Sequence, residues 1–323
     1  MTRLLVGGYT PDKGTGTGIA VLDDEGVTQI VTAESPSWLA RHPSRPVLYA
    51  VAETDPGGVA AWSLVDGVPA APLGTGETGG ADPCHLTVDP TGQFLVTANY
   101  TGGSVAVHAL GDDGGIGTRT DLVRHERSGS HERQAAAHPH MVRVDGVSLL
   151  VTDLGGDAIY RYRLDDQGRL HRSAIIDTPP ASGPRHIAQA GGQWYVTAEL
   201  SGQVLVFDDG WDFVGAVPLT MSSTQSLPAE ILASPDGRFL YVANRGPDTV
   251  SVFALGDGLP AYVVEVRTGH WPRHIAWSDG HLYVANQLSH DVMIMQVDAG
   301  DGVPALEQTI NTPSPTCILP SVN

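Results

Sequence analysis

Short runs of apolar residues, separated by polar turns, are the main pattern along this chain. Runs such as "FLYVAN" at 239–244 are rich in aromatic and β-branched residues, and "TVSVFAL" at 249–255 alternates apolar and polar side chains. A period of two is typical of a half-buried β-strand. The turns carry Asp, Pro and Gly, as in "DPTG" and "SPDG". The pattern predicts many short strands, and no stretch of good length has the period of an amphipathic helix.

The same strand pattern recurs at intervals of about 45 residues. Each unit begins at a proline and continues with a short apolar run, a turn, a β-rich run, a polar loop and an alternating run, and a fourth, weaker strand completes it. A repeat of this length with four strands per unit indicates a β-propeller. The anchoring prolines are Pro36, Pro83, Pro139, Pro184, Pro228, Pro272 and Pro315.

The seventh unit is divided between the two ends of the chain. "PSPTCILP" at 313–320 supplies only an inner strand, whereas "RLLVGGYT" at 3–10 and "GIAVLDDEG" at 18–26 resemble the strands that should follow it. Joining them closes the ring and leaves no open sheet edge. We therefore expect residues 1–323 to form a single all-β domain. The predicted fold is a seven-bladed β-propeller with four-stranded blades, one of them closed by joining the N- and C-terminal strands.

Charged side chains gather at the two positions after each anchoring proline. Inner strands surround the axis of a propeller, so the starts of these strands form rings at one end of it. Packing explains Pro, Ile and Ala of "PRHIA", which occurs at 184–188 and at 272–276, but buried Arg and His are costly without partners. The first ring is Ser37, Cys84, His140, Arg185, Ala229, Arg273 and Thr316, and the second is Trp38, His85, Met141, His186, Glu230, His274 and Cys317.

This arrangement predicts a pocket that accepts an anion. Arginine binds carboxylate and phosphate groups with paired hydrogen bonds, and His140 or Glu230 nearby is a candidate acid or base. If Glu230 lies between Arg185 and Arg273, its pKa falls and it becomes the weaker base, which favours His140.

A further polar ring is expected at the end of the second strand of each unit. In most units these residues are best explained as the first residues of polar turns. Arg245, which follows one of them directly, and Asn286 are the candidates for a binding role. The ring is Glu53, Asn99, Asp153, Glu199, Asn244 and Asn286.

The composition narrows the choice of partners and location. A net charge of −18 over 323 residues disfavours binding to nucleic acid or to an anionic membrane. The chain has two cysteines, and no apolar run reaches the length of a membrane span. The apolar run after the first residues is too short for a signal peptide. We expect a cytoplasmic protein, a monomer or weak homodimer, that acts on a small anionic molecule.

Metal binding is not expected. "HERQAAAHPH" at 131–140 contains three histidines and a glutamate, but their spacing fits no ordinary zinc pattern. The rings combine one glutamate with several cationic residues, which is a poor site for a hard cation. We expect neither a metal nor a cofactor.

Several motifs in order resemble the seven-bladed propeller lactonase family, which includes bacterial 6-phosphogluconolactonases and fungal carboxy-cis,cis-muconate cyclases. The motifs are "PCHLTVDPTGQFLVTANYTGGSVAV", "RQAAAHPHMV", "GPRHIA", "PAEILASPDGRFLYVANRG", "WPRHIAW" and "PTC". The resemblance covers essentially the whole chain and implies hydrolysis of 6-phosphoglucono-lactone without a metal. It places a catalytic histidine at His140 or His138, two arginines at Arg185 and Arg273, and a glutamate at Glu230.

Three functions remain open at this point. The first is a lactone hydrolase in which His140 or Glu230 is the base and the arginines stabilise the oxyanion or hold the substrate. The second is a muconate-type lactone cyclase or isomerase, and the third is a propeller that only binds other proteins. The candidate substrate-binding residues are His138, His186, His274, Arg245, Asn286 and His85.

Overall fold

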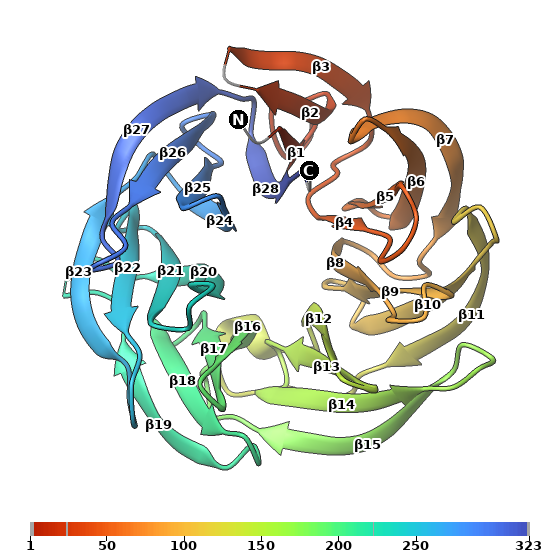
Figure 1. Cartoon of the computed structure of the whole chain (residues 1–323). Coiled ribbons are helices and arrows are strands. Elements are labelled where there is room, and N and C mark those ends of the chain that lie inside the picture. The colour runs from red at the N-terminus through yellow and green to blue at the C-terminus, as the bar shows by residue number, and fades with distance from the viewer. Residues whose placement is uncertain (1–2, 24, 222, 322–323) are drawn as a thin grey trace.

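The computed structural model describes residues 3–23, 25–221 and 223–321. Seven antiparallel sheets of four strands each form a ring, with one strand of each sheet beside the axis and the last one at the rim (Figure 1). The prediction of a seven-bladed β-propeller is confirmed. Each sheet is called a blade, and blade 1 is the one that contains the N-terminal strands.

The strands are given from axis to rim in each blade. Blade 1 has β28 (Pro315–Pro320), β1 (Leu4–Gly8), β2 (Gly18–Asp23) and β3 (Gly26–Thr32). Blade 2 has β4 (Leu39–Arg41), β5 (Val47–Ala52), β6 (Gly58–Val65) and β7 (Val68–Glu77). Blade 3 has β8 (Pro83–Val88), β9 (Phe94–Asn99), β10 (Ser104–Leu110) and β11 (Ile116–Arg124).

The remaining blades follow the same order. Blade 4 has β12 (Pro139–Asp145), β13 (Ser148–Asp153), β14 (Ala158–Leu164) and β15 (Leu170–Asp177). Blade 5 has β16 (Pro184–Ala190), β17 (Gln193–Ala198), β18 (Gln203–Asp208) and β19 (Phe213–Pro218). Blade 6 has β20 (Leu227–Ala233), β21 (Phe239–Arg245), β22 (Thr249–Ala254) and β23 (Ala261–Arg267). Blade 7 has β24 (Pro272–Ser278), β25 (His281–Asn286), β26 (Asp291–Val297) and β27 (Pro304–Asn311).

Blade 1 closes the ring as the sequence predicts. The C-terminal strand β28 pairs with β1, with Leu5 opposite Leu319 and Val6 opposite Ile318. In Figure 1 these two strands, from opposite ends of the colour scale, lie side by side. The pairing satisfies the facing backbone groups of the two terminal strands and completes the four-stranded sheet of blade 1.

The apolar core lies between neighbouring blades rather than inside any one of them. Tyr241 and Val252 of blade 6 pack with Ile275 and Val284 of blade 7, and all four are buried. Strands with both faces covered read as continuous apolar runs, which explains sequences such as "FLYVA". The polar loops are left at the two ends of the axis, where a ligand site can form without disturbing the core.

One short helix is present among the described residues: η1 (Glu132–Gln134), a 3₁₀ turn in the connection from β11 to β12. Within the same residues, no helix has the length and apolar character needed to span a bilayer.

In six of the seven blades the inner strand begins at its anchoring proline with a β-bulge. In blade 4, Pro139 lies opposite Asp153 while Met141 lies opposite Thr152, so His140 is an extra residue without a ladder partner. A bulge turns the side chain of such a residue out of the regular alternation. The same shift of register occurs in five other blades, and the bulged segments contain Cys84, Arg185, Ala229, Arg273 and Thr316. The bulges therefore aim the first ring at the axis.

Thr152 fixes the geometry of two neighbouring blades at this level. Its hydroxyl accepts a hydrogen bond from the backbone of Met141 at 3.0 Å and donates one to the carbonyl of Arg185 at 2.6 Å.

Thr152→Val is expected to lower the free energy of unfolding by about 1–3 kcal/mol, because it leaves buried backbone groups unpaired. Urea unfolding measures this. Thr97→Val is the control, since the buried Thr97 hydroxyl has no hydrogen-bond partner among the described residues. An equal loss of stability in both variants would contradict the assignment.

Candidate active site

The site lies at the end of the axis where the inner strands begin, here called the proline face. The chain reaches it through strained backbone: φ is +51° at Asp82, +64° at Trp271 and +43° at Ser314, each directly before an anchoring proline. Left-handed backbone at residues other than glycine costs about 1–3 kcal/mol each and is retained where the surroundings enforce it. The bulges and these kinks together set the first ring.

Glu199 is the centre of a buried cluster of arginines. Its carboxylate pairs with Arg185 Nε at 3.0 Å and with Arg245 Nη2 at 2.7 Å through Oε2, and with Arg133 Nη2 at 2.7 Å through Oε1. Arg245 is oriented further by the carbonyls of Leu227 and Pro228. We call Glu199 and these three arginines the Glu199 cluster.

The charged groups in this cluster shift the pKa values of one another. Burial would raise the pKa of Glu199, but the arginines outweigh it and hold that pKa at about 2. Burial, together with the like charge of Arg245, lowers the pKa of Arg185 to about 9. All four groups are therefore charged at neutral pH, and three guanidinium groups around one carboxylate leave a net charge of +2.

A second cluster lies around Arg273. Its Nη2 donates to the hydroxyl of Tyr9 at 2.7 Å, and Tyr9 donates to Glu53 Oε1 at 2.6 Å. Ser37 donates to the other oxygen of Glu53. Lys13 lies 3.5 Å from Glu53 and 2.5 Å from Asp82. We call these residues the Glu53 cluster; its two cations are matched by two carboxylates.

His140 is buried, and charged residues of both clusters influence its pKa. Burial, followed by the positive charges of Arg185, His186 and Arg273, lowers the pKa of His140 well below its usual value of 6.5. Its Nδ1 has no hydrogen-bond partner among the described residues. The ring packs edge-on against His186 at 5.1 Å and Tyr100 at 5.5 Å. His140 is therefore a neutral imidazole at pH 7, close enough to the guanidinium groups of both clusters for their charges to lower its pKa.

Glu230 contacts histidines rather than arginines. Its Oε2 lies 2.9 Å from His186 Nδ1 and 3.4 Å from His274 Nε2. The blade that carries Glu230 does lie between those of Arg185 and Arg273, as expected, but these arginines have their closest contacts with Glu199 and Tyr9. Contrary to the expectation of a lowered pKa, burial raises the pKa of Glu230 above its usual 4.5. Both of its oxygens are occupied, which suits a group that positions His186.

The second ring also fastens blades to one another. His85 accepts the backbone N–H of Val142 at 3.4 Å, and His274 accepts that of Ile318 at 3.3 Å, each from the next blade. Burial lowers the pKa of His85 well below 6.5 and that of His274 to about 4, so both are neutral acceptors at pH 7. His85 stacks on Trp38 at 4.0 Å. For His85 and His274 the structure gives a packing role that the sequence did not suggest.

At the end of the second strand, the register of the structure shifts the sequence alignment by one residue for Glu53 and Glu199. By register, Ala198 lies opposite the proline of its blade, as do Asn99, Asp153, Asn244 and Asn286 in theirs. Glu199 thus corresponds to Arg245, one position further along. The same register places Tyr9, Glu53 and Tyr100 at this next position. Sequence reasoning treated both glutamates as turn residues because it placed them one position too early.

The Asn and Asp side chains at the earlier position hold turns. Asn286 donates to Asp291 at 2.7 Å, Asn99 to Ser104 at 3.0 Å and Asn244 to Ser251 at 2.7 Å. The turn explanation is confirmed for them, and it applies to Asn286 as well, for which a binding role was expected. Arg245, the other candidate, does reach the Glu199 cluster.

His138 lies at the rim of the site. Its ring stacks on Tyr100 at 4.5 Å, and its Nδ1 is 3.0 Å from the carbonyl of Tyr100. Asp153 holds its backbone N–H at 2.8 Å and also pairs with the buried His125 at 2.9 Å. Of the two histidines in "AHPH", His140 is the one whose pKa burial and the charges of Arg185, Arg273 and Arg245 lower.

Three buried or partly buried residues that the sequence did not single out complete the site: Tyr9, Arg133 and Glu53. Tyr9 and Glu53 lie outside the family motifs, and Arg133 is the first residue of "RQAAAHPHMV", although the motif assigns it no role.

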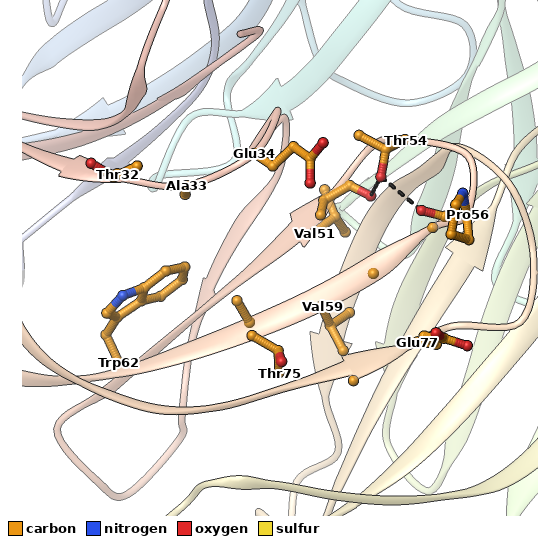
Figure 2. Close-up of a pocket in the computed structure, with 15 residues that line it drawn as sticks. Thr32, Ala33, Glu34, Val51, Thr54, Pro56, Val59, Trp62, Thr75 and Glu77 are labelled. Atoms are coloured by element: carbon orange, nitrogen blue, oxygen red, sulfur yellow. Dashed lines mark hydrogen bonds between the residues drawn. The ribbon is translucent and has the colours of Figure 1, made fainter.

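A hollow of about 500 Å³ lies elsewhere, between the rim of blade 1 and blade 2 (Figure 2). Thr32 and Glu34 approach it from one side and Val59, Trp62 and Glu77 from the other. Its described lining contains carboxylates and no Arg, Lys or His. It is unsuited to the anion that the proline face attracts. Across the part of the chain that the structure describes, no group of three or more His, Cys, Asp or Glu is arranged to hold a metal ion.

Comparison with known proteins agrees with this geometry. Residues 3–320 match the family described as "Lactonase, 7-bladed beta-propeller". The chain belongs to this family of seven-bladed propeller lactonases. It is 32% identical to a 6-phosphogluconolactonase of Bacillus subtilis over 311 residues, which cover 88% of this chain and 86% of that protein.

Solved structures show the same fold over the full length. The periplasmic gluconolactonase of Pseudomonas aeruginosa superposes with a TM-score of 0.92 at 28% identity, covering 99% of each chain. A protein from Lactobacillus plantarum superposes with a TM-score of 0.92 at 29% identity, covering 100% of each chain.

Proposed function

We propose that this protein hydrolyses 6-phosphoglucono-lactone to 6-phosphogluconate at the proline face. The observation that carries the proposal is the buried, neutral His140, whose pKa is lowered by burial and by the charges of Arg185 in one cluster and Arg273 in the other. A base that is free at neutral pH and guanidinium groups placed for a developing negative charge are what lactone opening requires. The names of the relatives, a 6-phosphogluconolactonase and a gluconolactonase, support a lactone of gluconate as substrate.

In the proposed reaction His140 takes a proton from water as the water oxygen attacks the lactone carbonyl. The carbonyl oxygen becomes an oxyanion, which the guanidinium of Arg273 stabilises. The ring C–O bond then breaks, and the alkoxide that leaves accepts the proton from His140. One water is consumed and one hydroxy acid is formed, with the base returned to its neutral state.

Arg273 suits the oxyanion better than Arg185 does. Arg273 has no carboxylate in direct contact and donates only to the Tyr9 hydroxyl among the described residues, and its side chain is partly exposed. Arg185 is buried and already committed to Glu199. Glu230 holds His186, and His186 packs against the ring of His140, so these two residues position the base.

Arg273→Gln is expected to lower kcat by about 100- to 1000-fold, because it removes the donor that faces the oxyanion. Lactone opening is followed as acid release at pH 6.5 with spontaneous hydrolysis subtracted. Arg238→Gln is the control: Arg238 is half exposed on the opposite face and bonds carbonyls at 299 and 300. If Arg273→Gln raises KM while kcat stays unchanged, the arginine holds the substrate and is not the oxyanion donor.

A further inference from the structure

We infer that Arg133, on the connection from β11 to β12, selects for a phosphate group at the far end of the lactone. This inference rests on the proposed function. It concerns a residue to which the sequence motifs assigned no role, and it assigns the two clusters of the site to two parts of one substrate.

Arg133 is held in place by hydrogen bonds from one of its three guanidinium nitrogens. Its Nη2 donates to Glu199 at 2.7 Å and to the Tyr100 hydroxyl at 3.2 Å. All its side-chain hydrogen bonds within the described residues use this one nitrogen, and the side chain is 38% exposed. The Nε–H and the Nη1–H groups make no hydrogen bond within the described residues, so each is free to donate a charge-assisted hydrogen bond to a phosphate oxygen.

The loop that carries Arg133 is anchored to the turn between β13 and β14. Gln134, the next residue, is fully buried and donates to the Leu154 carbonyl at 2.8 Å and to Asp157 at 2.7 Å. His131 caps the same turn by accepting the Arg133 N–H at 3.1 Å. An arginine whose backbone is fixed in this way loses little freedom on binding, which favours a specific contact.

Charge distinguishes the two sides of the site. The Glu199 cluster carries a net charge of +2, which matches the charge of a phosphate monoester near pH 7. The Glu53 cluster pairs Arg273 and Lys13 with Glu53 and Asp82 and is close to neutral. A phosphate is therefore expected beside Arg133 and Arg245, which leaves Arg273 and His140 for the lactone carbonyl.

The test compares two substrates that differ only in the phosphate. Wild type, Arg133→Gln and Arg127→Gln are assayed with 6-phosphoglucono-lactone and with glucono-lactone. Arg127 is the matched control, because it lies on the same loop, is similarly exposed, and pairs with the exposed Asp177 instead. Arg133→Gln is expected to lower the ratio of the two kcat/KM values by about 10- to 100-fold in favour of glucono-lactone. Arg127→Gln is expected to leave that ratio as in wild type.

Binding of the stable products gives a second reading. Titration with 6-phosphogluconate and gluconate should show the same loss of discrimination in Arg133→Gln. If Arg133→Gln lowers kcat/KM equally for both lactones, or for neither, while wild type hydrolyses them, the inference is overturned and the proposed function stands. If wild type accelerates neither lactone but still prefers 6-phosphogluconate through Arg133, the proposed function fails and the phosphate site remains. If wild type shows no preference in either assay, the inference is also overturned.

Discussion

Replacing His140 by alanine is expected to lower kcat/KM for 6-phosphoglucono-lactone by about 100- to 10,000-fold, because it removes the base that takes the proton of the attacking water. His140 is singled out by its position rather than by its type. It lies on a bulge, and the charges of Arg185, Arg273 and Arg245 lower its pKa. Glu230, the other candidate, has both oxygens occupied and is held among histidines.

The pH dependence of kcat/KM follows from the lowered pKa of His140. The pKa of His140 lies well below 6.5, so the neutral, active form dominates throughout the neutral range. As pH falls through that lowered pKa, protonation removes the base, and kcat/KM should decline only at acidic pH. His171→Ala is the control, since His171 is exposed at the rim and pairs with Asp165. A His140→Ala profile that keeps the activity and acid limb of wild type would identify another residue as the base.

Glu199→Gln is expected to lower the free energy of unfolding by about 3–5 kcal/mol, because it leaves buried arginines without their counter-charge. Both Arg185 and Arg245 are almost fully buried and pair with the same oxygen of Glu199. Urea unfolding at pH 7 measures the loss. Glu307→Gln, which removes an exposed carboxylate paired with His281, is the control and should change stability little.

The same carboxylate makes stability depend on pH in a predictable direction. The pKa of Glu199 is lowered from 4.5 to about 2 in the folded protein. Its contribution is therefore complete above pH 4.5 and is lost as pH falls from 4.5 toward 2. The difference in stability between wild type and Glu199→Gln should shrink over that interval. A difference that stays constant there would show that Glu199 acts through packing and not through its charge.

The fold could be predicted because the propeller repeats its packing residues. Prolines such as Pro184 and Pro272 mark the start of each inner strand, and the split of blade 1 followed from the incomplete last unit. The two copies of "PRHIA" begin β16 and β24, which flank β20 with Glu230. The repeat thus located Arg185 and Arg273 in neighbouring parts of one ring.

The partners of these residues could not be predicted in the same way. Pairing depends on register, and a shift of one residue placed Glu199 among turn residues although it lies one position beyond them. Arg133 comes from a loop whose path no periodicity records. Tyr9 comes from the opposite end of the chain from Arg273. These contacts arise from ring closure and loop folding, which local sequence patterns do not encode.

In the proposed function the proline face combines a neutral base, a guanidinium for the oxyanion and a separate cationic cluster. His140, Arg185 and Arg273 lie on bulges at the starts of inner strands. The most direct test of this account is the rate of acid release when purified wild-type protein is mixed with 6-phosphoglucono-lactone at pH 6.5, beside His140→Ala and buffer alone. The account predicts rapid, saturable hydrolysis by wild type and a rate close to that of buffer for His140→Ala. A wild-type rate no greater than that of buffer would contradict it.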